Sequence, residues 1–366
     1  MEHSVIVPWE VNEETDTQYV PEYIVNMATH VLKQYDFQVK GIECVTTKPD
    51  KGGAIWRLET NRGPKSLKLL HRRPMRSLFS LGAQRYLVDV KNARVPPIVK
   101  TKTGADYVEA GGKLWFVAKW IEPLEPVTKD LEGAKKLCYA LGEFHRLTKG
   151  YVPPKQAELA SRLHKWPSYY KKVIEKMDWF RNVAKVYNDM PASKTLLEVV
   201  GQFEEQAKRS YERLINSDYD KLVKHGNEHW GLVHQDYGWS NGQMGPGGMW
   251  IIDLDGVAYD LPVRDLSKLI SGTMADLFEW KVDWIKEMID AYATANPIPP
   301  DLYNILLIDL SLPMDFYKNM KEVVYEPDVF LNEETEKMIR TIVQTDQTKW
   351  PVLKQLERET KAGRRN

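Results

Sequence analysis

One segment, from Leu232 to Asp265, constrains the fold of this chain more than any other. It contains Asp236, then four residues, then Asn241, and after a Gly-rich turn an apolar run that ends at Asp253. The turn, Gly245 to Gly248, predicts a tight connection between two short strands. Such a hairpin returns Asp253 to the side of Asn241, so that both side chains face one cleft.

The order of these groups resembles the catalytic loop of kinases, which delivers a base and then two metal ligands. Phosphoryl transfer needs a hydroxyl in line with the γ-phosphate and cations that neutralise the developing charge. Asp236 would accept or orient the hydroxyl proton, and Asn241 and Asp253 offer the oxygen ligands that Mg²⁺ prefers. Asp255 adds a second acid, as a further metal ligand or a substrate contact. The alternative is a polar loop before a buried strand with a capping Asp, and His234 alone is better explained as structural.

A neighbouring segment narrows the resemblance. Asp260-Leu261-Pro262, followed by Arg264-Asp265-Leu266, is similar to the Pro-x-x-Asp-Leu segment of the aminoglycoside phosphotransferase and choline kinase superfamily. Within that superfamily, the wording IIDLDGVAYDLPVRDLSKLI most resembles the spore coat protein S/I family of spore-forming bacilli. The resemblance covers roughly residues 20 to 345. It implies that Asp265 holds the catalytic loop by hydrogen bonds.

The resemblance also implies a fold of the α+β class with the two lobes of a protein kinase. The small N-terminal lobe would be an antiparallel β-sheet with helices, and the large C-terminal lobe would be mainly α-helical. A length of 366 residues suits two lobes better than one core. The predicted parts are an N-terminal arm (1–20), a nucleotide-binding N-lobe (21–121), a hinge (122–127), a C-lobe with the catalytic loop and substrate pocket (128–345), and a charged C-terminal helix or fraying tail (346–366).

The N-lobe pattern predicts a helix over residues 21–35 followed by three strands. These strands are at 38–45, 54–60 and 65–70. The resembled fold places Gly52 and Gly53 in a loop over the ATP phosphates, where glycine permits close approach of the backbone, although two glycines in a hairpin are a weak motif. Lys68, on the third strand, is the candidate that binds the α- and β-phosphates, and the alternative is a solvated lysine.

The helix predicted over residues 75–90 departs from the kinase pattern because it contains no Glu. Kinases pair the strand lysine with a Glu on this helix. The nearest substitute is Gln84, with Asp89 as a poorer one, and a neutral Gln would orient Lys68 more weakly. A basic cluster before the helix is predicted to be solvated rather than to contact phosphate. Its members are His71, Arg72, Arg73 and Arg76.

Two further strands, at 95–99 and 114–120, complete the predicted sheet. The second leads into a segment marked by prolines, which predicts the hinge. In the resembled fold, backbone N–H and C=O groups at this point bind the adenine edge. The residues concerned are Trp120, Ile121 and Glu122.

Beyond the hinge the apolar spacing predicts helices throughout. The first begins at Asp130 and leads to His145, which is predicted to be structural. Two long charged helices follow that would shape a substrate pocket, and four more come after the catalytic loop. Their predicted ranges are 167–188, 193–222, 264–274, 276–294, 301–321 and 333–345.

Composition excludes several classes of protein. Lys+Arg and Asp+Glu are each 51, so no basic field indicates a nucleic-acid partner. Two cysteines are too few for a disulfide framework or a Cys-based zinc site. The N-terminus lacks a signal-peptide pattern and no apolar run is long enough to span a membrane, which predicts cytoplasmic synthesis and no membrane partner. The resemblance adds a location in the spore coat, and 12 Trp and 18 Tyr predict surfaces for a ligand or other spore coat proteins.

These features predict a phosphotransferase that uses ATP and Mg²⁺ and takes a hydroxyl group of a small molecule or envelope component as acceptor. Only six residues separate Asp253 from Asp260, which leaves no room for an activation loop and favours small substrates. The alternative is a kinase-fold structural component of the spore coat with weak or no catalysis, because the helix Glu is missing. A third, weaker hypothesis is a regulator that binds MgATP without turnover.

Overall fold

Two compact units make up the described part of the chain. The computed structural model describes residues 5–10 and 18–363, with side chains to residue 359. The first unit comprises 1–127, 150–160 and 239–258, and the second comprises 128–149, 161–238 and 259–366. Residues 1–4 and 11–17 of the predicted arm, and 364–366 of the predicted tail, lie outside the described residues.

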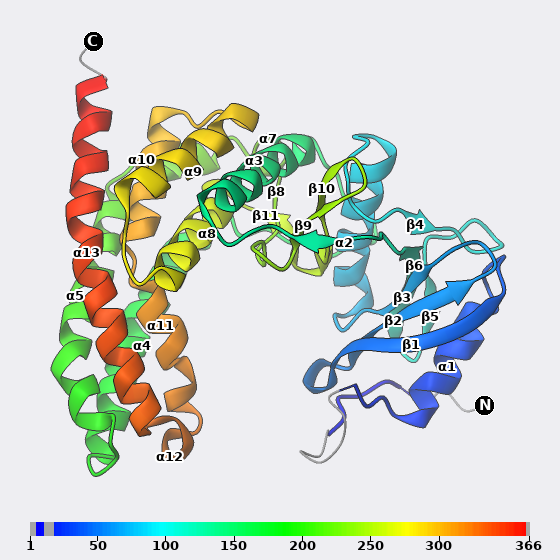
Figure 1. Cartoon of the computed structure of the whole chain (residues 1–366), viewed down its shortest axis with the longest axis horizontal. Helices are drawn as coiled ribbons and strands as arrows, with labels where there is room; N and C mark the ends of the chain where they lie inside the picture. Colours follow the sequence, from blue (N-terminus) through cyan, green and yellow to red (C-terminus); the bar gives the residue numbers. More distant parts are fainter. Residues whose placement is uncertain (1–4, 11–17, 364–366) are drawn as a thin grey trace. The chain divides into compact units, whose positions relative to one another are not determined.

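An antiparallel sheet is the centre of the first unit (Figure 1), as the sequence predicts, and it has six strands where the sequence predicts five. Its order is β1-β2-β3-β6-β4, with β5, a short strand that the sequence pattern does not predict, paired to β6. A second sheet has the order β10-β9-β7. The elements of this unit are α1 (Glu22–Leu32), β1 (Val39–Lys48), η1 (Pro49–Lys51), β2 (Gly53–Thr60), β3 (Lys65–Leu69), α2 (Pro74–Asp89), β4 (Ile98–Val99), β5 (Val108–Ala110), β6 (Lys113–Lys119), β7 (Glu125–Pro126), β9 (Gly242–Gly245), β10 (Gly248–Ile251) and η2 (Leu254–Gly256).

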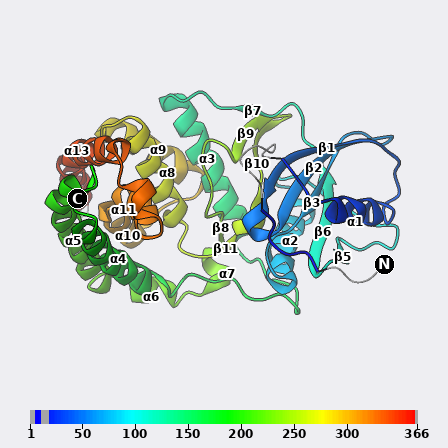
Figure 2. The same cartoon turned by 90° about the horizontal axis from the view of Figure 1, so that it is seen from below.

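Alternation of side chains along the strands gives the large sheet two different faces. Leu67 and Trp115 lie in the buried cluster that includes α1. Phe116 and Ala118 lie in a second cluster with residues of α2. Figures 1 and 2 show α1 and α2 on opposite sides of the sheet. Lys68, which follows Leu67 and pairs with Phe116, therefore lies on the α2 side.

Part of the predicted N-terminal arm packs against this sheet. The backbone N–H of Ile6 donates to the carbonyl of Gly111 at 2.9 Å, and that of Trp9 donates to the carbonyl of Pro49 at 3.0 Å. The Ile6 side chain is buried in the α1 cluster. Residues 5–10 thus belong to the core of the first unit.

The second unit is almost entirely helical, as predicted for the C-lobe. Figure 2 shows α4 and α5 side by side, and these two helices are in contact. The elements are α3 (Leu131–Thr148), α4 (Trp166–Val186), α5 (Ser193–Ile215), α6 (Tyr219–Val223), α7 (Asn227–Trp230), β8 (Leu232–Val233), α8 (Val263–Asp276), α9 (Val282–Ala295), α10 (Pro300–Ser311), α11 (Met314–Met320), η3 (Lys321–Val324), α12 (Pro327–Phe330) and α13 (Glu333–Gly363), and β11 (Ala258–Tyr259) spans the change of unit.

Several predicted helix boundaries in this unit are wrong. The helix predicted over 193–222 is α5 and α6, and the helix predicted over 276–294 begins only at Val282. The single helix predicted over 301–321 is α10 and α11, interrupted at Leu312, which takes the extended backbone that a following proline favours. The predicted break at 345 does not occur, since α13 is continuous and passes through Pro351. Thr345 and Lys349 are buried, so this part of α13 packs against the unit and does not fray.

A close helix contact in the second unit depends on a glycine. Gly142 on α3 faces α9, where an added Cβ would lie 2.6 Å from the carbonyl oxygen of Tyr292. Only glycine permits this approach of the two helices without a shift of backbone. Within the described parts of the chain, no helix is both long and apolar enough to cross a membrane.

Candidate functional site

A cavity of about 430 Å³ lies against the α2-side face of the sheet, wholly within the first unit. This volume is in the range of small-ligand pockets, roughly 300–1,000 Å³. Ile55, Phe116 and Leu124 are among its apolar walls, and Lys68 and Asp253 are among its charged ones. A largely apolar cavity with a few polar groups suits a ligand with a flat apolar part and a charged part.

Lys68 is held by two carboxylates. Its ammonium lies 2.5 Å from Asp253 Oδ1 and 2.8 Å from Asp255 Oδ1. Lys68 sits on β3 between β2 and β6 and is 9% exposed. Burial alone would lower the pKa of Lys68, but Asp255 and Asp253 together outweigh it and raise that pKa. The ammonium therefore stays charged inside the cavity.

The predicted hairpin before Asp253 is present. Strands β9 and β10 pair antiparallel, with Gly242 opposite Ile251 and Gly245 opposite Gly248. The backbone N–H of Ile252 donates to the carbonyl of Asn241 at 3.0 Å. Asn241 and Asp253 therefore lie at the same end of the hairpin, as the sequence predicts.

Asp253 has a left-handed backbone, with φ of 59° and ψ of 61°. This conformation costs energy for residues other than glycine, with Asn and Asp the most tolerant, and it concentrates at functional sites. Asp253 also lies 3.8 Å from the ammonium of Lys48, at the end of β1. Sequence reasoning missed Lys48, and its place just before the glycine loop was the available signal.

Asp255 is more deeply placed than Asp253. It lies in the turn η2 and is 7% exposed. One of its oxygens, Oδ1, binds Lys68, whereas Oδ2 has no hydrogen-bond partner among the residues described. The Nδ1 atom of the His71 ring lies 3.9 Å from Oδ2. Burial lowers the pKa of His71 to about 4 despite the pull of Asp255, so this imidazole is neutral at pH 7.

The basic cluster before α2 is mostly not solvated, which corrects the prediction. Of its four members only Arg73 is exposed, and Arg73 pairs with Glu158. The guanidinium of Arg76 donates to the carbonyl of Val257 at 2.6 Å. His71 lines a small cavity together with Lys48 and Lys68. The signal missed was that these residues connect a buried strand to a buried helix.

The predicted phosphate loop is a compact 3₁₀ turn, η1, between β1 and β2. Gly52 has φ of +65°, and a Cβ there would touch Ile6 and the backbone of Val7. Gly53 starts β2, and a Cβ there would lie 2.8 Å from Cβ of His71. Gly53 lines the small cavity with Lys68. Packing favours glycine at position 53, whereas the positive φ favours it at position 52.

The three residues predicted to bind adenine all line the 430 Å³ cavity. The N–H of Trp120 donates to the carbonyl of Pro64, so that N–H is already engaged. The Glu122 carboxylate binds Arg57 at 3.2 Å. Backbone groups of Ile121 and Glu122 therefore remain the candidates for the adenine edge.

Gln84 does not orient Lys68 as the sequence analysis predicts. It lines the same cavity as Lys68, but its side-chain amide donates to the carbonyl of Pro96 at 2.6 Å. Asp89, the poorer substitute, lies at the exposed end of α2 and pairs with Arg85 at 3.4 Å. The carboxylates that hold Lys68 come from the loop after β10 instead.

Asp236, His234 and Asp265 belong to the second unit. The Asp265 carboxylate accepts the backbone N–H of His234 at 2.5 Å and that of Gln235 at 3.0 Å. The ammonium of Lys268 donates to the carbonyl of Gln235 at 2.8 Å. Gln235 has φ of +73°, so these bonds fix a strained residue directly before Asp236, which is exposed.

A buried chain of hydrogen bonds supports Asp265. His145 binds the Tyr292 hydroxyl at 2.7 Å and Asp265 Oδ2 at 3.3 Å, and both rings are fully buried. Burial alone would raise the pKa of Asp265, but the bond with His145 and the charge of Lys268 lower it to about 2. His234 is fully buried beside the Phe144 ring. His145 and His234 thus lie in the core, where a packing role was expected.

The surroundings of Asp236 include a lysine that sequence reasoning missed. Burial and the charge of Arg264 lower the pKa of Lys318 on α11, whereas Asp315 and Asp236 raise it. Nothing in the pattern around Lys318 marks it in the sequence. An acceptor beside Asp236 would meet charges of both signs.

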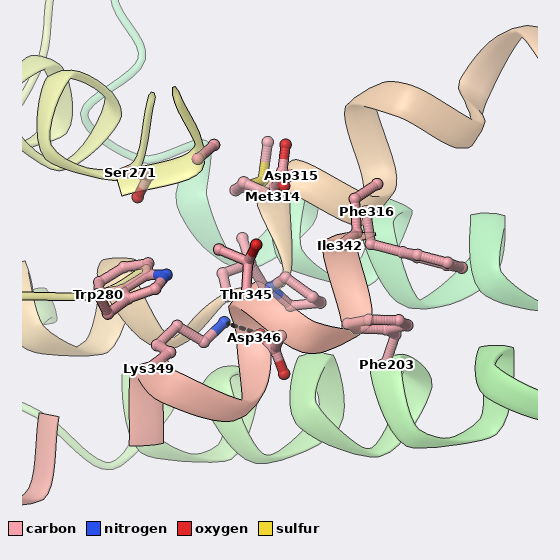
Figure 3. A pocket seen from close by; sticks show the side chains of 13 residues that line it. Phe203, Ser271, Trp280, Met314, Asp315, Phe316, Ile342, Thr345, Asp346 and Lys349 are labelled. Atoms are coloured by element: carbon pink, nitrogen blue, oxygen red, sulfur yellow. Dashed lines mark ion pairs between the residues drawn. The ribbon is translucent and has the colours of Figure 1, made fainter. Parts of the chain in front are cut away.

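A second cavity in the second unit is drawn in Figure 3. It lies among α5, α8, α11 and α13 and has a volume of about 30 Å³. Lys349 lines it and pairs with Asp346 at 2.6 Å. This volume is far below the range of small-ligand pockets, so the cavity is a small gap in the core and not an acceptor pocket.

The donor set favours a metal that arrives with a ligand. Among the described residues, no group of three or more His, Cys, Asp or Glu side chains is arranged to hold a metal ion. Mg²⁺ at nucleotide sites takes one or two protein oxygens and completes its shell with phosphates and water. Asn241 and Asp253 fit that requirement.

Comparisons of the sequence match a protein family and a curated relative. The family described as Spore coat putative kinase YutH matches residues 76–356. Spore coat protein S of Bacillus subtilis (strain 168) is 30% identical over 296 residues, covering 81% of this chain and 83% of that protein.

Solved structures confirm the predicted kinase-like fold. An aminoglycoside phosphotransferase from Alicyclobacillus acidocaldarius subsp. acidocaldarius DSM 446 has a TM-score of 0.76 at 14% identity, covering 96% of this chain and 100% of that one. Amicoumacin kinase hAmiN, in complex with AMP-PNP, Ca²⁺ and Ami, has a TM-score of 0.58 at 18% identity, covering 90% and 95%. The microcompartment-associated aminopropanol kinase has a TM-score of 0.57 at 15% identity, covering 92% and 98%.

Proposed function

This chain belongs to the family described as Spore coat putative kinase YutH, and from that membership we propose that it is an ATP-dependent phosphotransferase of the spore coat that requires Mg²⁺. The acceptor is a hydroxyl group of a small molecule or of an envelope component. One observation carries the proposal: Lys68 and Asp253 meet on the wall of a cavity large enough for a nucleotide, and Asn241 lies at the same end of the hairpin as Asp253. The location rests on the relative named spore coat protein S.

In this proposal the first unit binds the nucleotide. The apolar walls of the cavity take the base, and Ile121 and Glu122 offer backbone groups to its edge. Lys68 carries a positive charge on a rigid central strand, where it binds the α- and β-phosphates. Mg²⁺, held by Asn241 and Asp253, supplies charge neutralisation for the transferred phosphoryl group.

The second unit supplies the base. Asp236 accepts the proton of the acceptor hydroxyl or orients that hydroxyl. Because Asp265 fixes the two preceding N–H groups, the backbone that carries Asp236 is held in a single conformation. Because of this pre-organisation, less conformational entropy is lost when the reacting groups are brought together.

A structural coat component with little catalysis is the second candidate. The observation that favours it is that α2 contributes no carboxylate to Lys68, which is bound instead to the proposed metal ligand Asp253. In that account the acidic residues neutralise a buried lysine and bind no metal.

Phosphate transfer tests the proposal. Purified protein is incubated with [γ-³²P]ATP and Mg²⁺, with small alcohols, amino alcohols and sugars, and separately with purified spore envelope fragments. Wild type is expected to label at least one of these, and Asp236→Asn to label it at least about 100-fold more slowly. Asp220→Asn, an exposed acid on α6, is the matched control and should match wild type. Absence of both labelling and Mg²⁺-dependent nucleotide binding would favour the structural account, whereas binding of MgATP without labelling would favour a regulator.

A further inference from the structure

We propose that Asp255 positions Lys68 for nucleotide phosphates, the task that a helix glutamate performs in other kinases. The inference rests on the proposed function, because it concerns the same nucleotide site. Asp255 is here a positioning residue that acts through Lys68. In this proposal Asp253 and Asn241 bind the metal ion.

The first observation is the contact itself. The Lys68 ammonium lies 2.8 Å from Asp255 Oδ1, and both residues are more than nine-tenths buried. A buried charged pair at this distance is rigid, and loss of one partner leaves the other uncompensated. The strand that carries Lys68 is held between β2 and β6, so its backbone position is fixed.

The second observation is that α2 offers no carboxylate to bind Lys68 in place of Asp255. Asp89 is the one acid in the sequence of this helix, and it is paired with Arg85 near the helix end. The Gln84 amide is engaged by Pro96. The carboxylate that orients the strand lysine therefore comes from a different part of the chain, 187 residues beyond Lys68 by its numbering.

The third observation is that α2 still fixes the position of this carboxylate. The Arg76 guanidinium on α2 donates to the carbonyl of Val257, two residues after Asp255. The turn η2, which carries Asp255, also packs against α2. The helix thus acts on Lys68 through the backbone of the η2 turn and not through a Glu of its own.

The two acids differ in ways that divide their tasks. Asp253 has a strained backbone, a side chain that is 26% exposed, and Asn241 at the neighbouring strand end. Asp255 is enclosed, and its second oxygen faces neutral His71. When Asp253 turns to a metal ion, Asp255 keeps Lys68 in place. The rival assignment makes Asp255 a second metal ligand.

Calorimetric titration with ADP, in EDTA and in excess Mg²⁺, separates the two assignments. Asp255→Asn is expected to weaken ADP binding at least about tenfold in EDTA, with a similar factor in Mg²⁺. Asp253→Asn is expected to lose only the gain that Mg²⁺ provides. Removing a carboxylate near anionic phosphates would by charge alone tighten binding, so a weakening indicates misplaced Lys68. Asp50→Asn, an exposed acid on η1, measures that simple charge effect.

A double-mutant cycle completes the test. In a Lys68→Met background, Asp255→Asn should change ADP affinity less than twofold, and this double variant removes both charges of the buried Lys68–Asp255 pair. Unfolding by urea checks each variant for a native fold. Unchanged ADP affinity of Asp255→Asn in EDTA, or a further loss in the Lys68→Met background, overturns the inference alone. No ADP binding by wild type overturns the proposed function and the inference with it.

Discussion

Each unit contains a cluster of acidic side chains, and the two clusters differ in whether groups of the protein complete their hydrogen bonds. In the second unit, Asp265 accepts two backbone N–H groups and binds His145, and Asp265, His145 and His234 are all buried in the core. In the first unit, Asp253 and Asp255 share Lys68 on the wall of a 430 Å³ cavity. The carboxylates of both clusters come from one short stretch of sequence, residues 253–265.

This difference indicates that the Asp265 cluster serves stability and that the Lys68 cluster serves ligand binding. Asp265 lies in a fully satisfied network, which lowers its pKa to about 2 and rigidifies the core. The Lys68 cluster keeps a strained Asp253 and a buried Asp255 oxygen with no hydrogen-bond partner among the described residues. Such features are retained where a ligand completes the arrangement. Substitutions in the two clusters should therefore change different measurements.

The largest effect on stability is expected from Asp265→Asn. An amide cannot accept both N–H groups as the carboxylate does, and it presents donors to donors. We expect a loss of about 3 kcal/mol or more in the free energy of unfolding, measured with urea. Asp276→Asn, an exposed acid at the end of the same helix, should change it by less than about 0.5 kcal/mol. Equal stability of Asp265→Asn and wild type would remove the contrast between the clusters.

The pH dependence of stability tests a third buried acid, Asp260. Burial raises its pKa to about 7, although Arg264 and a 2.7 Å bond from Trp166 oppose this. The folded state then binds a proton that the unfolded state releases near pH 4, so the contribution of Asp260 falls as pH rises from 4 to 7. Relative to Asp260→Asn, wild type should lose about 1.4 kcal/mol per pH unit between pH 5 and 7. Parallel curves for the two proteins would contradict a neutral buried Asp260.

The smallest effects concern two helical glycines. Gly142→Ala should cost about 1–3 kcal/mol, because the new Cβ meets the Tyr292 carbonyl and disturbs the bond between His145 and Tyr292. Gly201→Ala on α5 is the matched control, since nothing lies within 4 Å of its Cβ, and it should stabilise by about 0.5–1 kcal/mol. Thermal unfolding of both variants measures these effects. Equal melting temperatures of Gly142→Ala and wild type would exclude a role of the α3–α9 contact in supporting the Asp265 cluster.

The hairpin and the sheet were predictable because their signals are local. The turn from Gly245 to Gly248 and the apolar run after it place Asn241 and Asp253 at one strand end without any distant contact. Alternation in the strands around Lys68 predicts its sheet position for the same reason. Pro313 was also a local signal for the break between α10 and α11, and the pattern around it was misinterpreted.

The partners of Lys68 were not predictable from local patterns. Whether Gln84, Asp253 or Asp255 binds Lys68 depends on side-chain positions contributed by segments more than 180 residues apart. The burial of His71 and the packing of Ile6 on the sheet have the same origin, since both require the tertiary fold. Composition and charge runs describe such residues only on average.

The most direct measurement of the central claim is calorimetric titration of wild type and Asp253→Asn with AMP-PNP, in Mg²⁺ and in EDTA. Asn tolerates the left-handed backbone at this position, so the substitution removes the charge without adding strain. The account predicts that wild type binds the nucleotide more tightly with Mg²⁺ than without it, and that Asp253→Asn loses that gain while it remains folded. Absence of Mg²⁺-dependent binding by wild type at millimolar nucleotide would contradict the account and leave the fold as a scaffold of the coat.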